Sequence, residues 1–190
     1  MSLPDESSLP QQVTLRPARA SDAVLLNRWR GEPSVRQFQP LGTAPLAQLR
    51  AELNHQQISD LYRGHGEKFQ WIVRFEDSAA GWITLVVTNW DHGLAELGYA
   101  LSTPFQKRGL MPQALTLLIA DLFLRTKLER LEARCAVDNA ASQRVLEKVG
   151  FRREGHLRDY FLLRGRRVDN YLFAILRSDF LPTLQGGSAG

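Results

Sequence analysis

The stretch FQKRGLMPQAL, residues 105–115, decides the predicted fold, because it joins a strand to a long helix across a single glycine. Pro112 suits a first helical turn, where its missing N–H would be unpaired anyway, and Gly109 lets the backbone turn sharply before it. The free N–H groups of the turn then point outward, beside Lys107 and Arg108. Such a helix start favours the binding of a pyrophosphate or similar anion. The alternative is a plain strand-to-helix turn with two exposed cations.

The segments around this turn predict strands before it and a helix after it. Three strand-like runs at 69–76, 81–90 and 94–101 are separated by turn compositions, which is the pattern of an antiparallel meander. Residues 112–126 (PQALTLLIADLFLRT) are apolar on almost every face and predict a buried helix. Residues 131–137 (LEARCAV) then have the composition of a strand. The chain therefore changes from an antiparallel to a βαβ-like connection at the turn.

The C-terminal third completes a mixed sheet. A short helix is expected from Ala140 to Lys148, because Gly150 is a natural residue to follow a helix end. Two strand-like runs, 153–163 and 167–176, are joined by a turn around Gly165. The predicted fold class is therefore α+β, with a mixed, mostly antiparallel central sheet and helices on both faces.

Length and composition indicate one domain. The chain has 190 residues, of which 44% are apolar and 23% charged, which is typical of a globular protein with a sizeable core. Residues 1–12 and 181–190 are rich in Ser, Gly, Pro and polar residues, so we expect flexible tails around a single domain at 13–180. Cys135 is the only cysteine, and no signal-peptide start or run of about 18 apolar residues is visible. These features predict a cytoplasmic protein that does not cross a membrane.

The positive charge is concentrated in the second half of the chain. Residues 125–177 hold 13 Lys and Arg against 7 Asp and Glu. Such a surplus favours polyanionic partners such as phosphates or nucleic acid, and a solvated face of mixed charge is the commoner explanation.

Residues 138–151 (DNAASQRVLEKVGF) contain two further candidate residues. Asp138 or Asn139 can cap the helix that follows, and Ser142 can be a solvated first-turn residue, so neither Asn139 nor Ser142 implies function by itself. The order of AELGYAL, the turn, NAAS and GFRREG nevertheless resembles the GNAT acyltransferases, and more narrowly the branch that acetylates the N-termini of ribosomal proteins. The resemblance covers about residues 13–177 and implies the GNAT fold and acetyl-CoA as co-substrate.

The resemblance also implies which residues bind the acetyl-CoA. The phosphate turn of this family has the form Q/R-x-x-G-x-G/A. Its three specified positions are occupied here by Gln106, Gly109 and Met111. Met111 stands where the family usually has Gly or Ala, so its larger side chain should hinder the diphosphate from approaching the backbone. Lys107 stands where this branch often has another glycine. Lys107 or Arg108 would compensate by charge. The expected binding residues are Leu101, Gln106, Lys107, Arg108, Gly109, Leu110, Met111, Asn139, Ser142 and Lys148, with Arg144 as a further candidate; Arg144 and Lys148 can equally be ordinary solvated cations.

Acetyl transfer to an amine requires a base, and a carboxylate is the expected one. Glu96 lies in an apolar strand-like run that leads to the turn, which makes it the first candidate, and an outward-facing Glu on an alternating strand is the alternative. Glu154, in the family's E-G element, is the second candidate for the base.

The leaving thiolate needs a proton, and the developing oxyanion needs a donor. Many members of the superfamily place a Tyr seven residues after the Asn, but Leu146 stands there. The resemblance therefore offers Ser142 beside the sulfur, with Asn139 binding the pantetheine. Tyr160 is a fallback that can equally be an aromatic packed on the sheet. The oxyanion would be met by a backbone N–H within residues 99–102, where the resemblance places a splayed strand.

The first functional hypothesis is transfer of an acetyl group from acetyl-CoA to the N-terminal α-amine of a protein such as a ribosomal protein, by direct attack in a ternary complex. A small amine or amino acid on the same scaffold is one alternative. A non-catalytic acyl-CoA-binding module, or an Arg-rich nucleic-acid binder, is another. We expect a homodimer to be possible, and no membrane partner or direct nucleic-acid binding. No metal is expected, because the four histidines and Cys135 are scattered without the spacing of a metal site.

Overall fold

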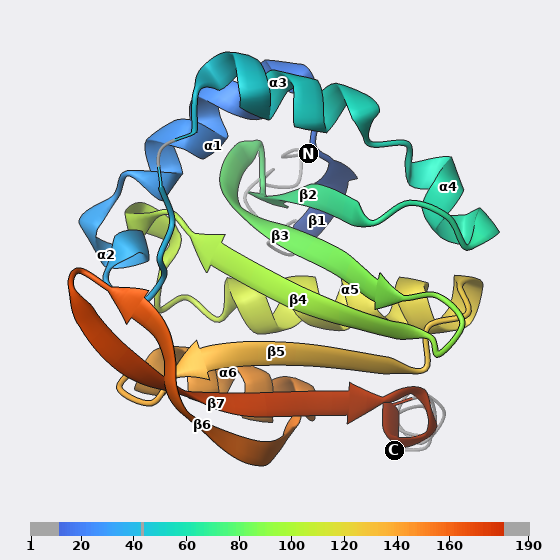
Figure 1. Cartoon of the computed structure of the whole chain (residues 1–190). Helices are drawn as coiled ribbons and strands as arrows, with labels where there is room; N and C mark the ends of the chain where they lie inside the picture. The colour runs from blue at the N-terminus through green and yellow to red at the C-terminus, as the bar shows by residue number, and fades with distance from the viewer. Residues whose placement is uncertain (1–11, 43, 181–190) are drawn as a thin grey trace, which may run out of the picture.

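The computed structural model describes residues 12–42 and 44–180, so the expected tails lie outside the described residues, apart from Gln12. The described part forms a single seven-stranded sheet with helices around it (Figure 1). The strands are β1 Val13–Pro17, β2 Lys68–Phe75, β3 Ser78–Asn89, β4 Leu94–Leu101, β5 Arg130–Ala136, β6 Arg152–Leu163 and β7 Arg166–Leu176. The helices are η2 Ala20–Asp22, α1 Ala23–Arg30, α2 Pro33–Arg36, α3 Leu46–His55, α4 Ile58–Arg63, η3 Thr103–Phe105, α5 Leu110–Arg125 and α6 Ala140–Val149.

The sheet is mixed and mostly antiparallel, as the sequence predicts. Its strand order is β1-β2-β3-β4-β5-β7-β6, and the only parallel neighbours among the described strands are β4 and β5. Their pairing covers three residue pairs and ends at Glu96 and Glu132, although β4 continues to Leu101 and β5 to Ala136. The two strands therefore separate toward their carboxyl ends (Figure 1). This confirms the expected splayed strand and opens the sheet at one point.

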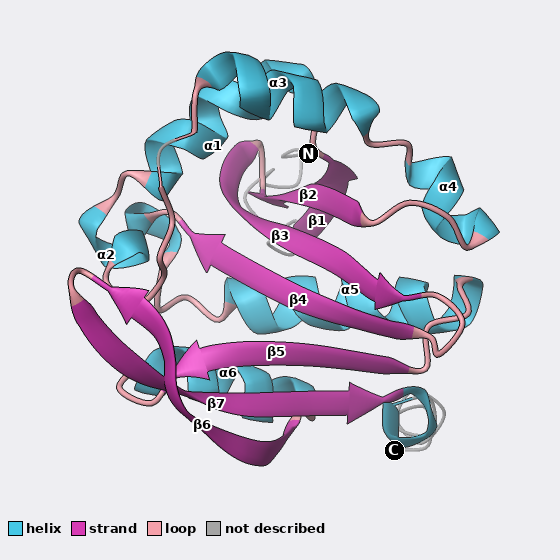
Figure 2. Cartoon of the chain, viewed as in Figure 1, coloured by secondary structure: helices cyan, strands magenta, loops and turns pink. Residues whose placement is uncertain are grey.

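Helices cover both faces of the sheet (Figure 2). Helices α5 and α6 bury their apolar side chains in the larger core cluster, whereas α1 and α3 pack on the opposite face. On that opposite face the ring of Trp29 stacks on the ring of Trp82, with centroids 6.1 Å apart, and fixes α1 over β3. Because α1 is held there, the chain that follows it reaches the opening between β4 and β5.

Helix α5 is less buried than its composition predicts. Leu117 and Leu124 are seven residues apart, so they lie on one helix face, and they are 51% and 65% exposed. The expected burial on almost every face is therefore wrong for the face that carries Leu117 and Leu124. Composition alone does not show which apolar residues remain exposed to solvent. Within the described ranges, no helix is both long enough and apolar enough to cross a membrane.

Candidate active site

The turn before α5 has the strained geometry of an anion-binding loop. Gly109 caps α5 in the left-handed conformation with φ of 72°, and Lys107, two residues earlier, has φ of 60°. Glycine adopts this conformation freely, whereas for lysine it costs about 1–2 kcal/mol. The strained lysine occupies the position where the sequence resemblance expects another glycine. Backbone strain of this kind is concentrated at functional sites.

Gln106 ties the turn to its neighbours. Its Nε2 donates to the backbone oxygen of Leu101 at 2.9 Å and to Oγ of Ser34 at 3.1 Å. Glu32 accepts hydrogen bonds from both the backbone N–H and the hydroxyl of Thr103, each at 2.7 Å. The start of α5 is therefore anchored to β4 and to the segment around α2, and its free N–H groups keep a fixed direction.

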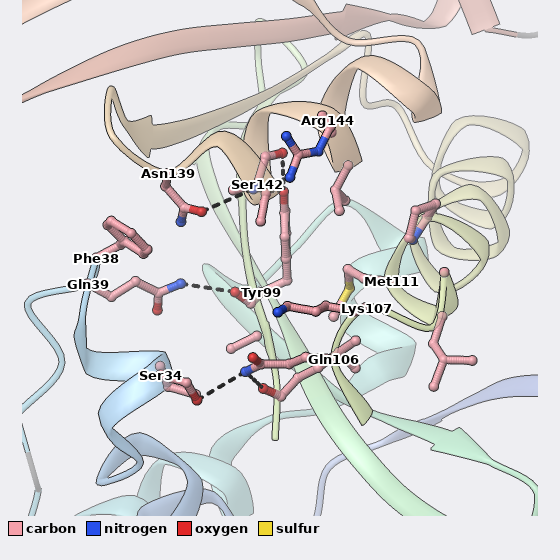
Figure 3. Close-up of a pocket in the computed structure, with 18 of the residues that line it drawn as sticks. Ser34, Phe38, Gln39, Tyr99, Gln106, Lys107, Met111, Asn139, Ser142 and Arg144 are labelled. Atoms are coloured by element: carbon pink, nitrogen blue, oxygen red, sulfur yellow. Dashed lines mark hydrogen bonds between the residues drawn. The ribbon is translucent and has the colours of Figure 1, made fainter. Parts of the chain in front are cut away.

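A cavity of about 500 Å³ lies between this turn, β4 and α6 (Figure 3). It brings together nine of the ten residues expected from the sequence to bind CoA, together with Arg144. These residues are Leu101, Gln106, Lys107, Gly109, Leu110, Met111, Asn139, Ser142 and Lys148. Met111 lines the cavity and is 3% exposed, so it forms part of the wall under the turn.

Arg108 is the one expected residue that the structure places elsewhere. Its guanidinium lies over the ring of Phe75, 4.5 Å from the centroid, and 6.0 Å from the centroid of Phe105. The side chain is therefore drawn away from the cavity by cation–π contacts. Lys107, Arg144 and Lys148 supply the cationic side chains of this cavity.

Three side chains meet where the cavity reaches the opening between β4 and β5 (Figure 3). Oδ1 of Asn139 accepts from the backbone N–H of Ser142 at 3.1 Å, which confirms Asn139 as the N-cap of α6. The hydroxyls of Ser142 and Tyr99 share a hydrogen bond of 2.8 Å. Gln39 holds the backbone of Tyr99 by donating from Nε2 to its carbonyl oxygen at 3.0 Å. The sequence pattern alone does not predict a role for the Tyr99 side chain.

Burial controls the protonation of the groups around Ser142. Burial raises the pKa of the Tyr99 hydroxyl above its usual value, and the hydrogen bond with Ser142 opposes this only in part. Burial likewise raises the pKa of the Cys135 thiol to about 11, against an opposing contribution from Ser142. Burial therefore keeps both groups protonated well above neutral pH, and Tyr99 remains able to donate a hydrogen bond.

A second cavity of about 390 Å³ adjoins the first. The two cavities share Phe38, Gln39, Tyr99, Asn139 and Ser142 in their walls. The second one extends over the sheet face that carries α1 and α3, and Tyr160 and Phe161 of β6 close its other side. Tyr160 is 43% exposed, and the guanidinium of Arg134 lies 5.5 Å from its ring centroid. A ligand in each cavity would meet the other at Tyr99 and Ser142.

Glu96 lines this second cavity and forms an ion pair with Arg134. Glu96 therefore faces the cavity. The alternative from the sequence, a Glu that points outward into bulk solvent, does not apply. Glu154, the second candidate base, binds Arg130 through both carboxylate oxygens and lines neither cavity. That ion pair lowers the pKa of the Glu154 carboxyl. Only Glu96 of the two has access to a bound amine.

The described residues contain no group of three or more His, Cys, Asp or Glu side chains arranged to hold a metal ion.

A sheet opened between two strands, with a helix start and three cationic side chains on one side and a carboxylate on the other, is suited to bringing two substrates together through the sheet. The chain belongs to the GNAT acetyltransferase family, because the family described as acetyltransferase (GNAT) domain matches residues 12–152. It is thus an N-acetyltransferase by family.

Several relatives share this assignment. The uncharacterized N-acetyltransferase p20 of Bacillus licheniformis is 29% identical over 177 residues, which are 92% of this chain and 98% of the relative. The [ribosomal protein uS5]-alanine N-acetyltransferase of Escherichia coli (strain K12) is 34% identical over 86 residues, 45% of this chain and 44% of the relative.

Two solved structures illustrate the fold. RimJ of Mycobacterium smegmatis, in complex with CoA-disulfide, is 27% identical with a TM-score of 0.73, and the match covers 92% of this chain and 89% of that one. Spermidine N-acetyltransferase of Vibrio cholerae, in complex with CoA and spermine, has a TM-score of 0.78 at 22% identity, and the match covers 90% and 98%. At that identity the likeness concerns the fold alone.

Proposed function

We propose that the protein transfers an acetyl group from acetyl-CoA to the N-terminal α-amine of a protein, such as a ribosomal protein, by direct attack in a ternary complex. The observation that carries this proposal is the pair of cavities that meet at Tyr99 and Ser142, with the cationic turn in one and Glu96 in the other. Each substrate would have its own cavity, which suits a ternary complex.

Acetyl-CoA suits the first cavity by its charge and by the polar groups in the wall. The free N–H groups at the start of α5, together with Lys107, Arg144 and Lys148, suit its phosphates. Asn139 also lines this cavity, where it suits the pantetheine, and β5 leaves the edge of β4 beyond Glu96 unpaired, so the pantetheine can run along that edge. The thioester would then lie at the opening between the strands.

The chain's own residues supply the two proton transfers. The ammonium of the acceptor gives a proton to the Glu96 carboxylate, and the resulting amine attacks the acetyl carbon. The bond from carbonyl carbon to sulfur then breaks, and the thiolate takes a proton from the hydroxyl of Ser142, which takes one from Tyr99 through their shared hydrogen bond. Tyr99, which lines both cavities, recovers its proton from the nitrogen, because the nitrogen loses its second proton as the amide forms. A backbone N–H within residues 99–102 stabilises the oxyanion.

A hydroxyl relay predicts coupled effects in a double-mutant cycle. We expect Tyr99→Phe and Ser142→Ala each to lower kcat by about tenfold, because each interrupts the same proton path. The double variant should lose little more than either single one, since residues that act as a unit are not additive. Tyr62→Phe removes a partly buried hydroxyl that is bound to Asp121 and lines neither cavity, and it serves as the control. Independent, multiplicative losses in single-turnover kinetics would contradict the relay.

The charge of the second cavity favours a peptide over a polyamine. Lys68 and Arg134 in its wall are paired with Glu52, Glu96 and Glu132, whereas Arg30 has no ion pair among the described residues. A polyamine would meet the unpaired Arg30 and little free negative charge there, whereas a peptide N-terminus presents one cation and several backbone groups. Among relatives, one is named for acetylating an alanine of ribosomal protein uS5 and another for acetylating spermidine, so the family accommodates both kinds of acceptor.

An acceptor screen tests this assignment. Release of free CoA thiol is measured with N-terminal peptides, amino acids and polyamines, and we expect the best peptide to exceed spermidine in kcat/KM by about tenfold or more. Thiol release with no acceptor is the blank. A polyamine preference would reject the peptide assignment and keep the enzyme class. Tight CoA binding without turnover on any amine would instead favour the non-catalytic module.

A further inference from the structure

Two carboxamide side chains in the wall of the second cavity are buried, and their oxygens accept no hydrogen bond from the described residues. Gln70 is 2% exposed and Asn170 is 1% exposed, and neither Oε1 of Gln70 nor Oδ1 of Asn170 has a hydrogen-bond partner among the described residues. Buried polar atoms in native proteins are nearly always hydrogen-bonded, so each exception calls for an explanation. Both residues line the cavity, where a ligand can supply the missing N–H donors.

The same cavity also contains unpartnered donors. Nε of Arg30 and Nε of Arg134 are buried without an acceptor among the described residues. Arg134 has ion pairs with Glu96 and Glu132 through its other nitrogens. Arg30 has no such ion pair in the described part of the chain, and the nearby Glu52 is already bound by Lys68 at 2.9 Å. Arg30 is therefore a partly buried cation whose counter-ion is missing.

The electrostatics of Arg30 agree with this geometry. Burial lowers the pKa of its guanidinium, and the charge of Glu52 opposes the change only in part. A cation that is desolvated without a partner is unfavourable unless an anion joins it. The pocket wall thus has a place for an anion at the end near α1.

Strand register places these groups on the same face of the sheet. Gln70 is opposite Thr84, and Thr84 is opposite Gly98, two residues from Glu96. Residues that pair across strands point to one face, as do residues two apart on a strand. By the same reasoning Asn170, opposite Ala136, shares a face with Arg134. The unpartnered groups and Glu96 therefore surround a single volume.

We propose that this cavity binds an acceptor that carries a carboxylate close to its amine, with the carboxylate on Arg30 and the N–H groups on the carboxamide oxygens. This inference rests on the proposed function, because it takes the second cavity as the acceptor site. A polyamine offers N–H donors and no anion, and an inorganic anion offers no N–H donor, so neither satisfies both sets of groups. The carboxylate can come from a free amino acid or from an acidic side chain at the start of a peptide.

Matched acceptor pairs test the carboxylate and identify its source. In one pair, a peptide beginning with Glu is compared with the same peptide beginning with Gln; in the other, free glycine is compared with glycinamide. We expect the carboxylate member of at least one pair to have a kcat/KM about tenfold higher, as is typical of a charge-assisted hydrogen bond. In Arg30→Gln this ratio should fall to about one. Arg28→Gln removes the same charge from an exposed position on α1 and should keep the wild-type ratio.

Two further measurements separate this inference from the fold and from the chemistry. Gln70→Leu removes a buried polar atom that has no partner, so we expect an unchanged or higher Tm together with a higher KM for the preferred acceptor. Calorimetry with CoA present needs no turnover and compares N-acetylglycine with N-acetylglycinamide, and the N-acetylated Glu peptide with the N-acetylated Gln peptide. Equal binding within both of these product pairs, equal kcat/KM within both acceptor pairs, or a ratio that survives in Arg30→Gln overturns the carboxylate site. If no amine is acetylated, the proposed function fails and the calorimetry still decides the carboxylate.

Discussion

We expect Glu96→Gln to turn over about 10²-fold more slowly than the wild type, with CoA affinity nearly unchanged, because the variant retains the shape of the cavity and loses its only candidate base. Glu96 lines the second cavity and does not line the first, so a change there affects the acceptor side alone. The measurement is kcat from CoA release, with the dissociation constant of CoA determined separately by calorimetry.

The matched control for this variant is Glu132→Gln. Glu132 lies beside Glu96 in the β4–β5 pairing and contacts the same arginine, Arg134, at 3.3 Å, but it lines neither cavity. Its loss alters the charge around Arg134 without removing a carboxylate from the acceptor site. A wild-type rate for Glu96→Gln from about pH 6 to 9 would assign the proton transfer to bulk water. A similar loss in both variants would mean that the charge balance of Arg134 matters, and not a base.

The sequence predicted those parts of the fold that depend on local pattern. The meander, the turn before α5 and the short helix are confirmed, and α6 ends within one residue of the expected Lys148. The turn at Arg164 and Gly165 is also confirmed, with both residues at positive φ, as a tight hairpin requires. Each of these features is encoded within a few neighbouring residues.

The features that the sequence did not predict depend on distant contacts. Tyr99 and Ser142 are 43 residues apart, and only the packing of α6 beside the unpaired end of β4 joins their hydroxyls. The direction of Arg108 depends on Phe75, which belongs to β2 on the far side of the meander. The alternation in ELGY places Glu96 and Gly98 on one face and Tyr99 on the other, which was the available signal for Tyr99. Without the sheet order, that signal does not identify its partner.

We expect Gly109→Val to weaken CoA binding by about thirtyfold, because the left-handed backbone of Gly109 excludes a β-branched residue at a cost of about 2 kcal/mol. Crowding adds nothing to this cost, because beyond its chain neighbours no heavy atom lies within 4 Å of a Cβ built at Gly109. The exposed turn can relax to relieve the strain, and its N–H groups then lose the direction that suits a phosphate.

Gly64→Val is the matched control for this last prediction. Gly64 ends α4 with φ of 78°, close to the 72° of Gly109, and a Cβ built there also meets no heavy atom within 4 Å. Both variants therefore introduce the same backbone strain, and neither introduces a clash. Gly64 lines neither cavity, so its variant should lose thermal stability and keep its CoA affinity. If Gly109→Val binds CoA as tightly as Gly64→Val does, the turn before α5 is not the phosphate site.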